Sequence, residues 1–230
     1  MVVGSGMIAK AFSSYASNNE VVIFASGVSN SASTKPSDFH REQELLENTM
    51  RLSATGKLIY FSTCSIYDPS LQDSAYVRHK LIMERLVEST AASYIIVRVS
   101  NPIGFTSNAH TVLNYFIEHI KTQSHFQVWK HASRNLLDVE DMFTICDNLI
   151  NNGEYNNSVI NIANPANYPV LLIIEMIEKH FKSKGNYALI EKGNSPLIDT
   201  SFIESLFPKL QIEFNNTYLP ALLQKYFPAL

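Results

Sequence analysis

The chain has 230 residues, of which 46% are apolar and 17% charged, with a net charge of −3. Such a chain can build one sizeable core, or a core with a small lobe. No cluster of Lys and Arg is present, which disfavours nucleic acid as a partner, and no apolar run reaches the roughly 18 residues of a membrane span. Two cysteines, Cys64 and Cys146, form no disulfide or metal framework. We therefore expect a cytoplasmic protein without a metal site.

The first residues predict a strand, a glycine-rich turn and a helix. Residues 1–3 are strand-like, positions 4–9 read Gly-Ser-Gly-Met-Ile-Ala, and residues 10–16 have a helical pattern. A Gly-x-Gly-x-x-Ala turn in this context is a dinucleotide fingerprint, because its glycines let the backbone approach a pyrophosphate and the helix start offers free N–H groups. The alternative is a tight turn that binds no ligand.

A buried strand over residues 20–24 follows and ends in the small residues Ala25, Ser26 and Gly27. Only about a dozen residues separate it from the first helix, which leaves no room for the additional strands that usually follow the first in a dinucleotide-binding sheet. The sequence then predicts a helix over residues 38–54 and a strand over residues 57–61.

Hydroxyl and basic side chains gather between Phe61 and Lys80. Thr63 follows the buried strand, where open α/β sheets bind their ligands. Tyr76 and Lys80 are four residues apart, so on a helix they share one face. An ammonium beside a phenol lowers the phenol's pKa from about 10 and favours proton exchange with a substrate oxygen. The alternative is a packed tyrosine and a solvated lysine.

The remaining chain predicts further strands at residues 93–98, 126–129, 158–163 and 187–191. Helices are expected at residues 112–121, 142–149, 170–181, 199–206 and 219–226. Glu140 and Asp141 precede the second of these helices, and we interpret them as capping residues because the helix dipole stabilises acidic side chains there.

The order of strand, Ser-Thr, short loop and Tyr-x-x-x-Lys helix resembles the extended branch of the short-chain dehydrogenase/reductase family, the NAD-dependent epimerases and dehydratases that act largely on nucleotide sugars. Arg-x-x-Asn-Pro-x-Gly at residues 98–104 is the most specific supporting motif. The resemblance covers nearly the whole chain, with one deletion after the first helix. It implies an α/β fold: a Rossmann-like doubly wound parallel sheet, trimmed on the side of the first strand, with a small C-terminal substrate lobe. Residues 1–163 would form the dinucleotide-binding domain, with residues 105–137 contributing to the substrate side, and residues 164–230 would form the lobe.

The resemblance also implies residue roles. Thr63, Tyr76 and Lys80 would be catalytic, with Thr63 also touching the substrate. Asn101 and Arg134 would hold the substrate diphosphate, since an Arg fork can bond two phosphate oxygens. The cofactor would be NAD or NADP, held by Gly4, Ser5, Gly6, Met7, Ile8, Ala25, Ser26, Gly27, Phe61, Tyr76, Lys80 and Pro102.

These roles predict an epimerase or reductase that acts on a nucleotide-activated sugar, with a place in polysaccharide biosynthesis. A 4,6-dehydratase is disfavoured, because the acidic pair that follows the Thr in such enzymes is replaced by Cys64 and Ser65. The alternative is a non-catalytic protein that binds a dinucleotide or nucleotide sugar and has lost efficient cofactor binding, which the missing strands favour. The first strand would become a sheet edge, which another segment or a second subunit of a homodimer could cover.

Overall fold

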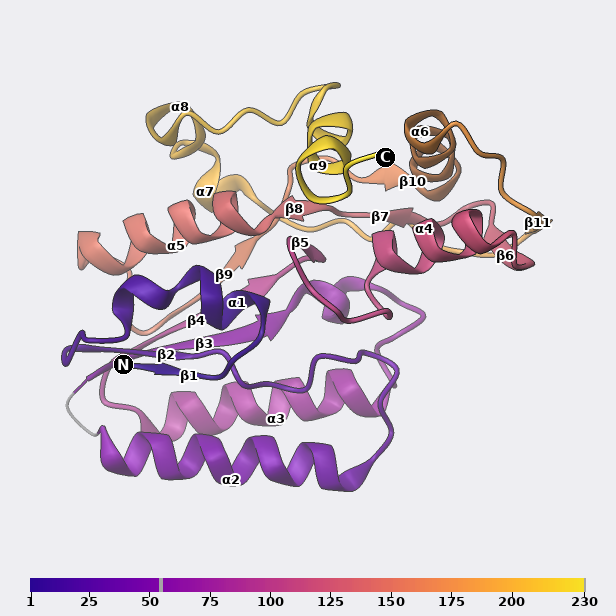
Figure 1. Ribbon diagram of the computed structural model, residues 1–230. Helices are drawn as coiled ribbons and strands as arrows, with labels where there is room; N and C mark the ends of the chain where they lie inside the picture. The colour runs from indigo at the N-terminus through magenta and orange to yellow at the C-terminus, as the bar shows by residue number, and fades with distance from the viewer. Residues whose placement is uncertain (54–55, 230) are drawn as a thin grey trace.

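A five-stranded parallel sheet forms the centre of the computed structural model, which describes residues 1–53 and 56–229 (Figure 1). Its strands lie in the order β1-β2-β3-β4-β9, and each pairs in parallel with its neighbour. Their bounds are Val2–Val3, Val21–Phe24, Lys57–Thr63, Tyr94–Val99 and Ser158–Ile162. The predicted α/β fold with a parallel Rossmann-like sheet is therefore confirmed.

The first strand lies at one end of this sheet. β1 pairs with β2 through Val2 opposite Ile23 and Val3 opposite Phe24, and within the described ranges it ends the strand order. The chain passes from α1 (Met7–Ala11) through a 3₁₀ turn directly into β2, and none of the described residues forms a strand on the outer side of β1. The predicted trimming of the sheet is thus present, and it leaves the backbone of a very short strand at an edge.

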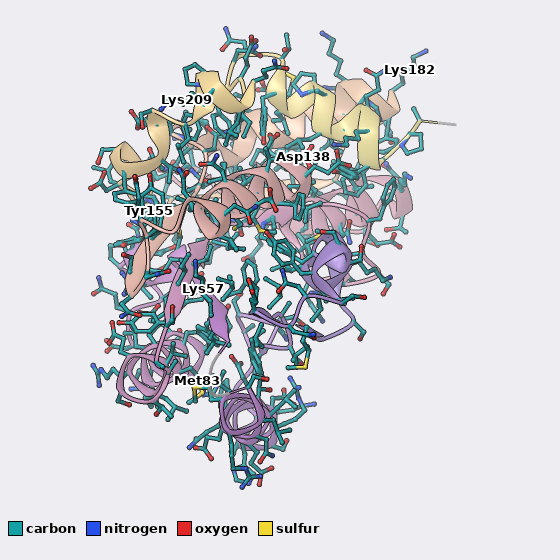
Figure 2. All side chains as sticks on the ribbon, turned by 90° about the vertical axis from the view of Figure 1, so that its left-hand side faces the viewer. Lys57, Met83, Asp138, Tyr155, Lys182 and Lys209 are labelled. Carbon is teal, nitrogen blue, oxygen red and sulfur yellow. The ribbon has the colours of Figure 1, made fainter. Side chains whose placement is uncertain are left out.

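Two long helices cover one face of the sheet. α2 (Pro36–Leu52) and α3 (Ala75–Thr90) lie side by side beneath the strands in Figure 1 and are seen end-on in Figure 2. Leu46 from α2 and Met83 from α3 are fully buried in one cluster with Tyr60 of β3. Proline at the start of α2 fits a first helical turn, where no N–H partner is needed. The predicted end of this helix at residue 54 lies outside the described residues, as does residue 230.

The helix after the glycine turn differs from its prediction. α1 spans Met7–Ala11, and a 3₁₀ turn at Ser13–Tyr15 follows it, in place of one helix over residues 10–16. Phe12 leaves the helical conformation with φ −94° and ψ 18°. Two serines come next, and serine hydroxyls compete with the helical hydrogen bonds of the backbone. Together with α5 (Val139–Asn152), this short helix covers the second face of the sheet.

The C-terminal part packs above α5 in Figure 1 and shares a buried cluster with the sheet. The helix predicted over residues 199–206 is the shorter α7 (Ser201–Glu204), and a separate short helix, α8 (Phe207–Leu210), follows it with Pro208 in its first turn. Of the described helices, none is both long and apolar enough to cross a bilayer. The elements outside the central sheet are η2 (Cys64–Tyr67), β5 (Pro102–Ile103) paired with β8 (Leu137–Asp138), α4 (Val112–Thr122), β6 (Phe126–Trp129) paired with β11 (Tyr187–Ile190), β7 (Ser133–Arg134) paired with β10 (Tyr168–Pro169), α6 (Val170–Phe181), α7 (Ser201–Glu204), α8 (Phe207–Leu210) and α9 (Tyr218–Tyr226).

Asp138 ties the last helix to the rest of the chain. It is the N-cap of α5, where its Oδ1 accepts a bond of 2.8 Å from the backbone N–H of Glu140. The same carboxylate accepts bonds of 2.6 Å from the Tyr226 hydroxyl and 2.9 Å from the Lys225 ammonium, both on α9. One capping carboxylate therefore fixes both the start of α5 and the position of α9.

Candidate active site

A cavity of about 650 Å³ opens at the carboxyl ends of β2, β3 and β4. This is where open parallel sheets bind ligands. Three predicted cofactor residues, Gly4, Ser5 and Ser26, do not line the cavity. The predicted residues that do are Gly6, Met7, Ile8, Ala25, Gly27, Phe61, Thr63, Tyr76, Lys80, Asn101, Pro102 and Arg134.

The two glycines of the N-terminal turn do different things. Gly4 has φ +128°, and a Cβ on it would lie 2.4 Å from the carbonyl oxygen of Ala25, so only glycine fits. Gly6 has an ordinary extended conformation, and a Cβ on it would meet no heavy atom within 4 Å. Gly4 is therefore required by the fold, whereas the bare backbone at Gly6 faces the space of the cavity.

Thr63 and Tyr76 come from adjacent elements. Thr63 ends β3, is buried, and caps η2 by accepting a bond of 3.0 Å from the N–H of Ser65. Tyr76 lies in the first turn of α3, which begins because the Ser74 hydroxyl accepts a bond of 3.1 Å from the N–H of Val77. The cap and the strand end thus bring the two hydroxyls to the same cavity wall.

The pKa of Tyr76 is raised to about 12, mainly by burial; the Thr63 hydroxyl opposes this rise, and the negative charge of Glu42 contributes to it. The expectation that Lys80 lowers this pKa below its usual value is wrong for this arrangement. The physical reason is that the Lys80 ammonium is paired with the Glu42 carboxylate at 2.9 Å, so the phenol lies beside an ion pair and not beside a free cation. At neutral pH the Tyr76 phenol therefore carries its proton.

Lys80 is almost completely buried at the cavity wall, where its Nζ donates to Glu42 Oε1 at 2.9 Å and to the Phe61 carbonyl at 2.8 Å. Burial lowers the pKa of Lys80 below its usual value, and the Glu42 carboxylate offsets only part of this shift. The sequence analysis did not identify Glu42. The signal was available, because Glu42 shares one face of its helix with Leu46 and Met50 at intervals of four residues, and a carboxylate on a buried face requires a partner.

Asn101 and Arg134 line the same cavity. Asn101 Nδ2 donates to the carbonyl of Asn135 at 2.8 Å, and Arg134 Nη1 donates to the carbonyl of Ser133 at 2.8 Å. Burial lowers the pKa of Arg134, and the nearby Asp68 carboxylate, which the sequence analysis did not single out, opposes this. Both predicted anion-binding side chains thus face the cavity from a wall that the Ser133–Asn135 segment helps to build.

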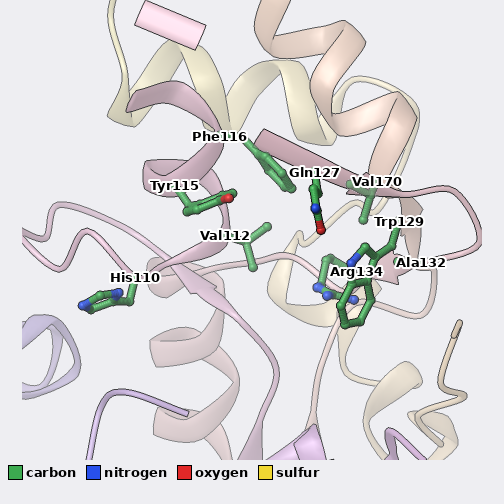
Figure 3. A pocket seen from close by; sticks show the side chains of 9 residues that line it. All are labelled: His110, Val112, Tyr115, Phe116, Gln127, Trp129, Ala132, Arg134 and Val170. Atoms are coloured by element: carbon green, nitrogen blue, oxygen red, sulfur yellow. The ribbon is translucent and has the colours of Figure 1, made fainter. Parts of the chain in front are cut away.

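A second cavity of about 360 Å³ adjoins the first (Figure 3). Arg134, Val112, His110 and Trp129 belong to both cavities. Aromatic side chains from α4 and β6 form part of its wall, and the side chain of Gln127 points into it in Figure 3. The sequence analysis did not identify this space, which is lined by His110, Val112, Tyr115, Phe116, Gln127, Trp129, Ala132, Arg134 and Val170.

The two positions after Thr63 also line the main cavity. Burial raises the pKa of the Cys64 thiol to about 12, and the Cys64 Sγ donates to the Arg98 carbonyl at 3.1 Å. Cys64 is thus a neutral thiol at physiological pH, and Ser65 has no acidic group. Neither residue can act as the carboxylate acid or base that water elimination from a sugar requires.

Comparisons with known proteins identify the family and the fold. A family model described as the NAD dependent epimerase/dehydratase family matches residues 4–163, which is more than half of the chain. A search of curated protein sequences finds no match.

Solved structures have the same fold at low sequence identity. The structure of RMD from Pseudomonas aeruginosa complexed with NADPH is 16% identical, with a TM-score of 0.72 over 97% of this chain and 98% of that chain. UDP-glucuronic acid 4-epimerase from Bacillus cereus, in complex with UDP-glucuronic acid and NAD, is 19% identical, with a TM-score of 0.71 over 90% of this chain and 74% of that chain. UDP-N-acetylglucosamine 4-epimerase from Methanobrevibacter ruminantium M1, in complex with UDP-N-acetylmuramic acid, is 17% identical, with a TM-score of 0.67 over 90% and 75%.

Proposed function

We propose that this chain, which belongs to the NAD dependent epimerase/dehydratase family, is an epimerase or reductase that acts on a nucleotide-activated sugar with NAD or NADP as cofactor. The family match confirms the resemblance to the extended short-chain dehydrogenases/reductases. One observation carries the proposal: Thr63, Tyr76, Lys80, Asn101 and Arg134 all line a single cavity at the carboxyl ends of the parallel strands.

The cofactor would occupy the part of the cavity between the glycine turn and α3. Open space at Gly6 supports this, since a pyrophosphate needs close approach to bare backbone. Gly27 adjoins the Lys80 ammonium, because a Cβ at Gly27 would lie 3.0 Å from Nζ, so a larger side chain there would crowd the lysine. When bound, the nicotinamide supplies hydride chemistry at a sugar carbon.

Tyr76 would exchange the proton at the sugar oxygen. Its raised pKa, about 12, keeps the phenol protonated at neutral pH, which is the form that gives a proton to a carbonyl oxygen as it becomes a hydroxyl. Thr63 would orient that oxygen with its hydroxyl. Lys80 would hold the cofactor ribose.

The nucleotide of the substrate would enter the second cavity. Its aromatic wall suits stacking with a planar base, and Gln127 offers donor and acceptor atoms for the edge of that base (Figure 3). Arg134 belongs to both cavities, so its guanidinium would meet the diphosphate that joins the base side to the sugar side.

The alternative is a non-catalytic protein that binds a dinucleotide or a nucleotide sugar. A specific observation favours it: Gly4, Ser5 and Ser26 do not line the cavity, and the sheet ends at β1, so the adenine side has little wall. Buried catalytic-type side chains oppose it, because packing alone does not require a Lys and a Tyr at one cavity wall.

Titration with NADH and NADPH, followed by nicotinamide fluorescence, tests the cofactor. Incubation with UDP-, GDP- and dTDP-sugars, with products separated by chromatography, then tests the chemistry. A new sugar product supports the enzyme. Binding of dinucleotide without any product from this panel would support the non-catalytic protein.

A further inference from the structure

Glu42 connects four parts of the chain at one buried point. It is fully buried, yet it carries a carboxylate whose two oxygens each accept hydrogen bonds. Oε2 accepts from the backbone N–H of Val28 at 2.7 Å and lies 3.1 Å from His79 Nε2. Oε1 accepts from the Tyr60 hydroxyl at 2.7 Å and from Lys80 at 2.9 Å. The loop after β2, the strand β3 and the helix α3 therefore meet at a side chain of α2.

These bonds fix the protonation of Glu42. Burial alone would raise the pKa of the carboxyl, but the Lys80 ammonium and the hydrogen bonds with His79, Tyr60 and the Val28 N–H outweigh it and hold the pKa well below its usual range. Glu42 is therefore a carboxylate throughout the physiological range. A buried carboxylate with this many donors is a rigid anchor, because moving it would leave several polar groups unpaired.

The ammonium of Lys80 has three N–H donors. Glu42 and the Phe61 carbonyl take two of them, and the Nζ also lies 4.4 Å from the centre of the Tyr60 ring. Lys80 lines the main cavity. The direction of its third N–H is therefore set by the groups that hold the other two.

We propose that Glu42 is a positioning residue that fixes the Lys80 ammonium at the cavity wall and leaves one N–H for the ribose of a bound dinucleotide. The inference rests on the dinucleotide part of the proposed function and is independent of which sugar is converted. A lysine on a flexible four-carbon stem would otherwise lose rotamer freedom when the cofactor binds, so prior fixation by Glu42 lowers the entropic cost of binding.

The test is a double-mutant cycle on NADH affinity, measured by fluorescence. Glu42→Gln keeps the size of the side chain and removes its charge, and we expect NADH to bind about tenfold more weakly. In a Lys80→Met background, the same substitution should have no effect, because Glu42 acts through Lys80. Glu178→Gln is the matched control: Glu178 is also buried and accepts from Lys184 at 2.7 Å and from the Gly185 N–H at 2.8 Å, away from the cavity.

A pH series gives a second readout. The titratable groups near Lys80 are Glu42 from α2, Tyr60 from β3, and Tyr76, His79 and Glu84 from α3. Without the Glu42 charge, the buried ammonium loses its proton at lower pH, so the NADH affinity of Glu42→Gln should fall as the pH rises. Wild type and Glu178→Gln should not show this fall.

Each result decides the question. Unchanged affinity in Glu42→Gln, or the same loss with and without Lys80, overturns the positioning role. If circular dichroism shows that Glu42→Gln does not fold, Tyr60→Phe replaces it, because it removes one bond to Glu42 without leaving a charge unpaired. A loss of affinity that persists in the Lys80→Met background would again overturn the positioning role.

Wild type that binds NADH but converts no nucleotide sugar refutes the proposed enzyme and leaves the Glu42 inference standing. Wild type that binds neither NADH nor NADPH refutes both.

Discussion

The two ends of the main cavity are built differently. At one end, Thr63, Tyr76 and Lys80 are held by a strand end, a helix cap and a buried carboxylate. Near the other end, Gly4 and Ser5 do not line the cavity and are exposed beside the two-residue edge strand β1. The proposed chemistry thus lies where the sheet is complete, and the proposed recognition of the adenosine half lies where the sheet has been shortened. A fold can lose recognition strands while the side chains for chemistry keep their support.

The largest effect is expected at the complete end. Tyr76→Phe should keep the fold and the NADH affinity, but lower turnover of the nucleotide sugar by roughly 10²–10⁴, because the proton carrier is lost. Steady-state kinetics together with circular dichroism measure this. Tyr67→Phe is the control, since the Tyr67 hydroxyl bonds Asn161 at 2.9 Å and does not line the cavity. Turnover that is unchanged in folded Tyr76→Phe would remove Tyr76 from the chemistry.

Loss of the Arg134 guanidinium should weaken binding of the nucleotide sugar. Arg134→Ala should raise the dissociation constant of the nucleotide sugar about 10- to 100-fold, since a charge-assisted hydrogen bond contributes about 1.5–3 kcal/mol. Affinity for NADH should stay nearly the same. Calorimetry with each ligand measures the difference, and Lys130→Ala provides a control on an exposed cation of the adjacent loop. Equal loss of both ligands would indicate a structural role for Arg134.

In the glycine turn, Gly4 should affect the stability of the fold and Gly6 the affinity for the cofactor. Gly4→Ala should destabilise the protein by about 1–3 kcal/mol or more, because the left-handed backbone and the contact with Ala25 exclude a Cβ. Gly6→Ala should unfold at the same denaturant concentration as wild type, because a Cβ there meets only open space. Its NADH affinity should nevertheless fall about tenfold if pyrophosphate approaches this backbone. Full affinity in Gly6→Ala would show that the cofactor does not bind at the turn.

The smallest difference in affinity is expected between NAD and NADP, at the side of the sheet that ends with β1. Without a residue that reads the ribose 2′ position, NAD and NADP should bind weakly and within about tenfold of each other. Calorimetry with both dinucleotides tests this. Arg41 lies here, with Nη2 donating to the Ser26 carbonyl at 3.1 Å. A strong preference for NADP that Arg41→Ala abolishes would contradict weak discrimination and assign the missing reader to Arg41.

Local spacing carried most of the prediction of the fold. Buried strands and the four-residue interval between Tyr76 and Lys80 depend only on neighbours in sequence, and the short link before β2 was sufficient to predict the sheet edge. Glu42 was missed because its importance depends on what meets it from Val28 and His79, which lie far away along the chain. The pKa of Tyr76 was predicted in the wrong direction for the same reason, since the partner of Lys80 was unknown. The second cavity arises from side chains of α4, β6 and β7 that no short motif connects.

Hydrogen bonds to the Asp138 carboxylate connect α9 to the segment that carries Arg134. Asp138 ends β8, the strand that follows Arg134 along the chain. Its carboxylate accepts hydrogen bonds from the Tyr226 hydroxyl and the Lys225 ammonium, both on α9. α9 therefore helps to hold in place the segment of β7 and β8, which carries the Arg134 guanidinium. We expect removal of the Lys225 and Tyr226 side chains to loosen the segment that carries Arg134, because Asp138 would lose both bonds to α9. A substitution on α9 is thus expected to weaken the diphosphate contact proposed for Arg134, although no residue of α9 lines the main cavity.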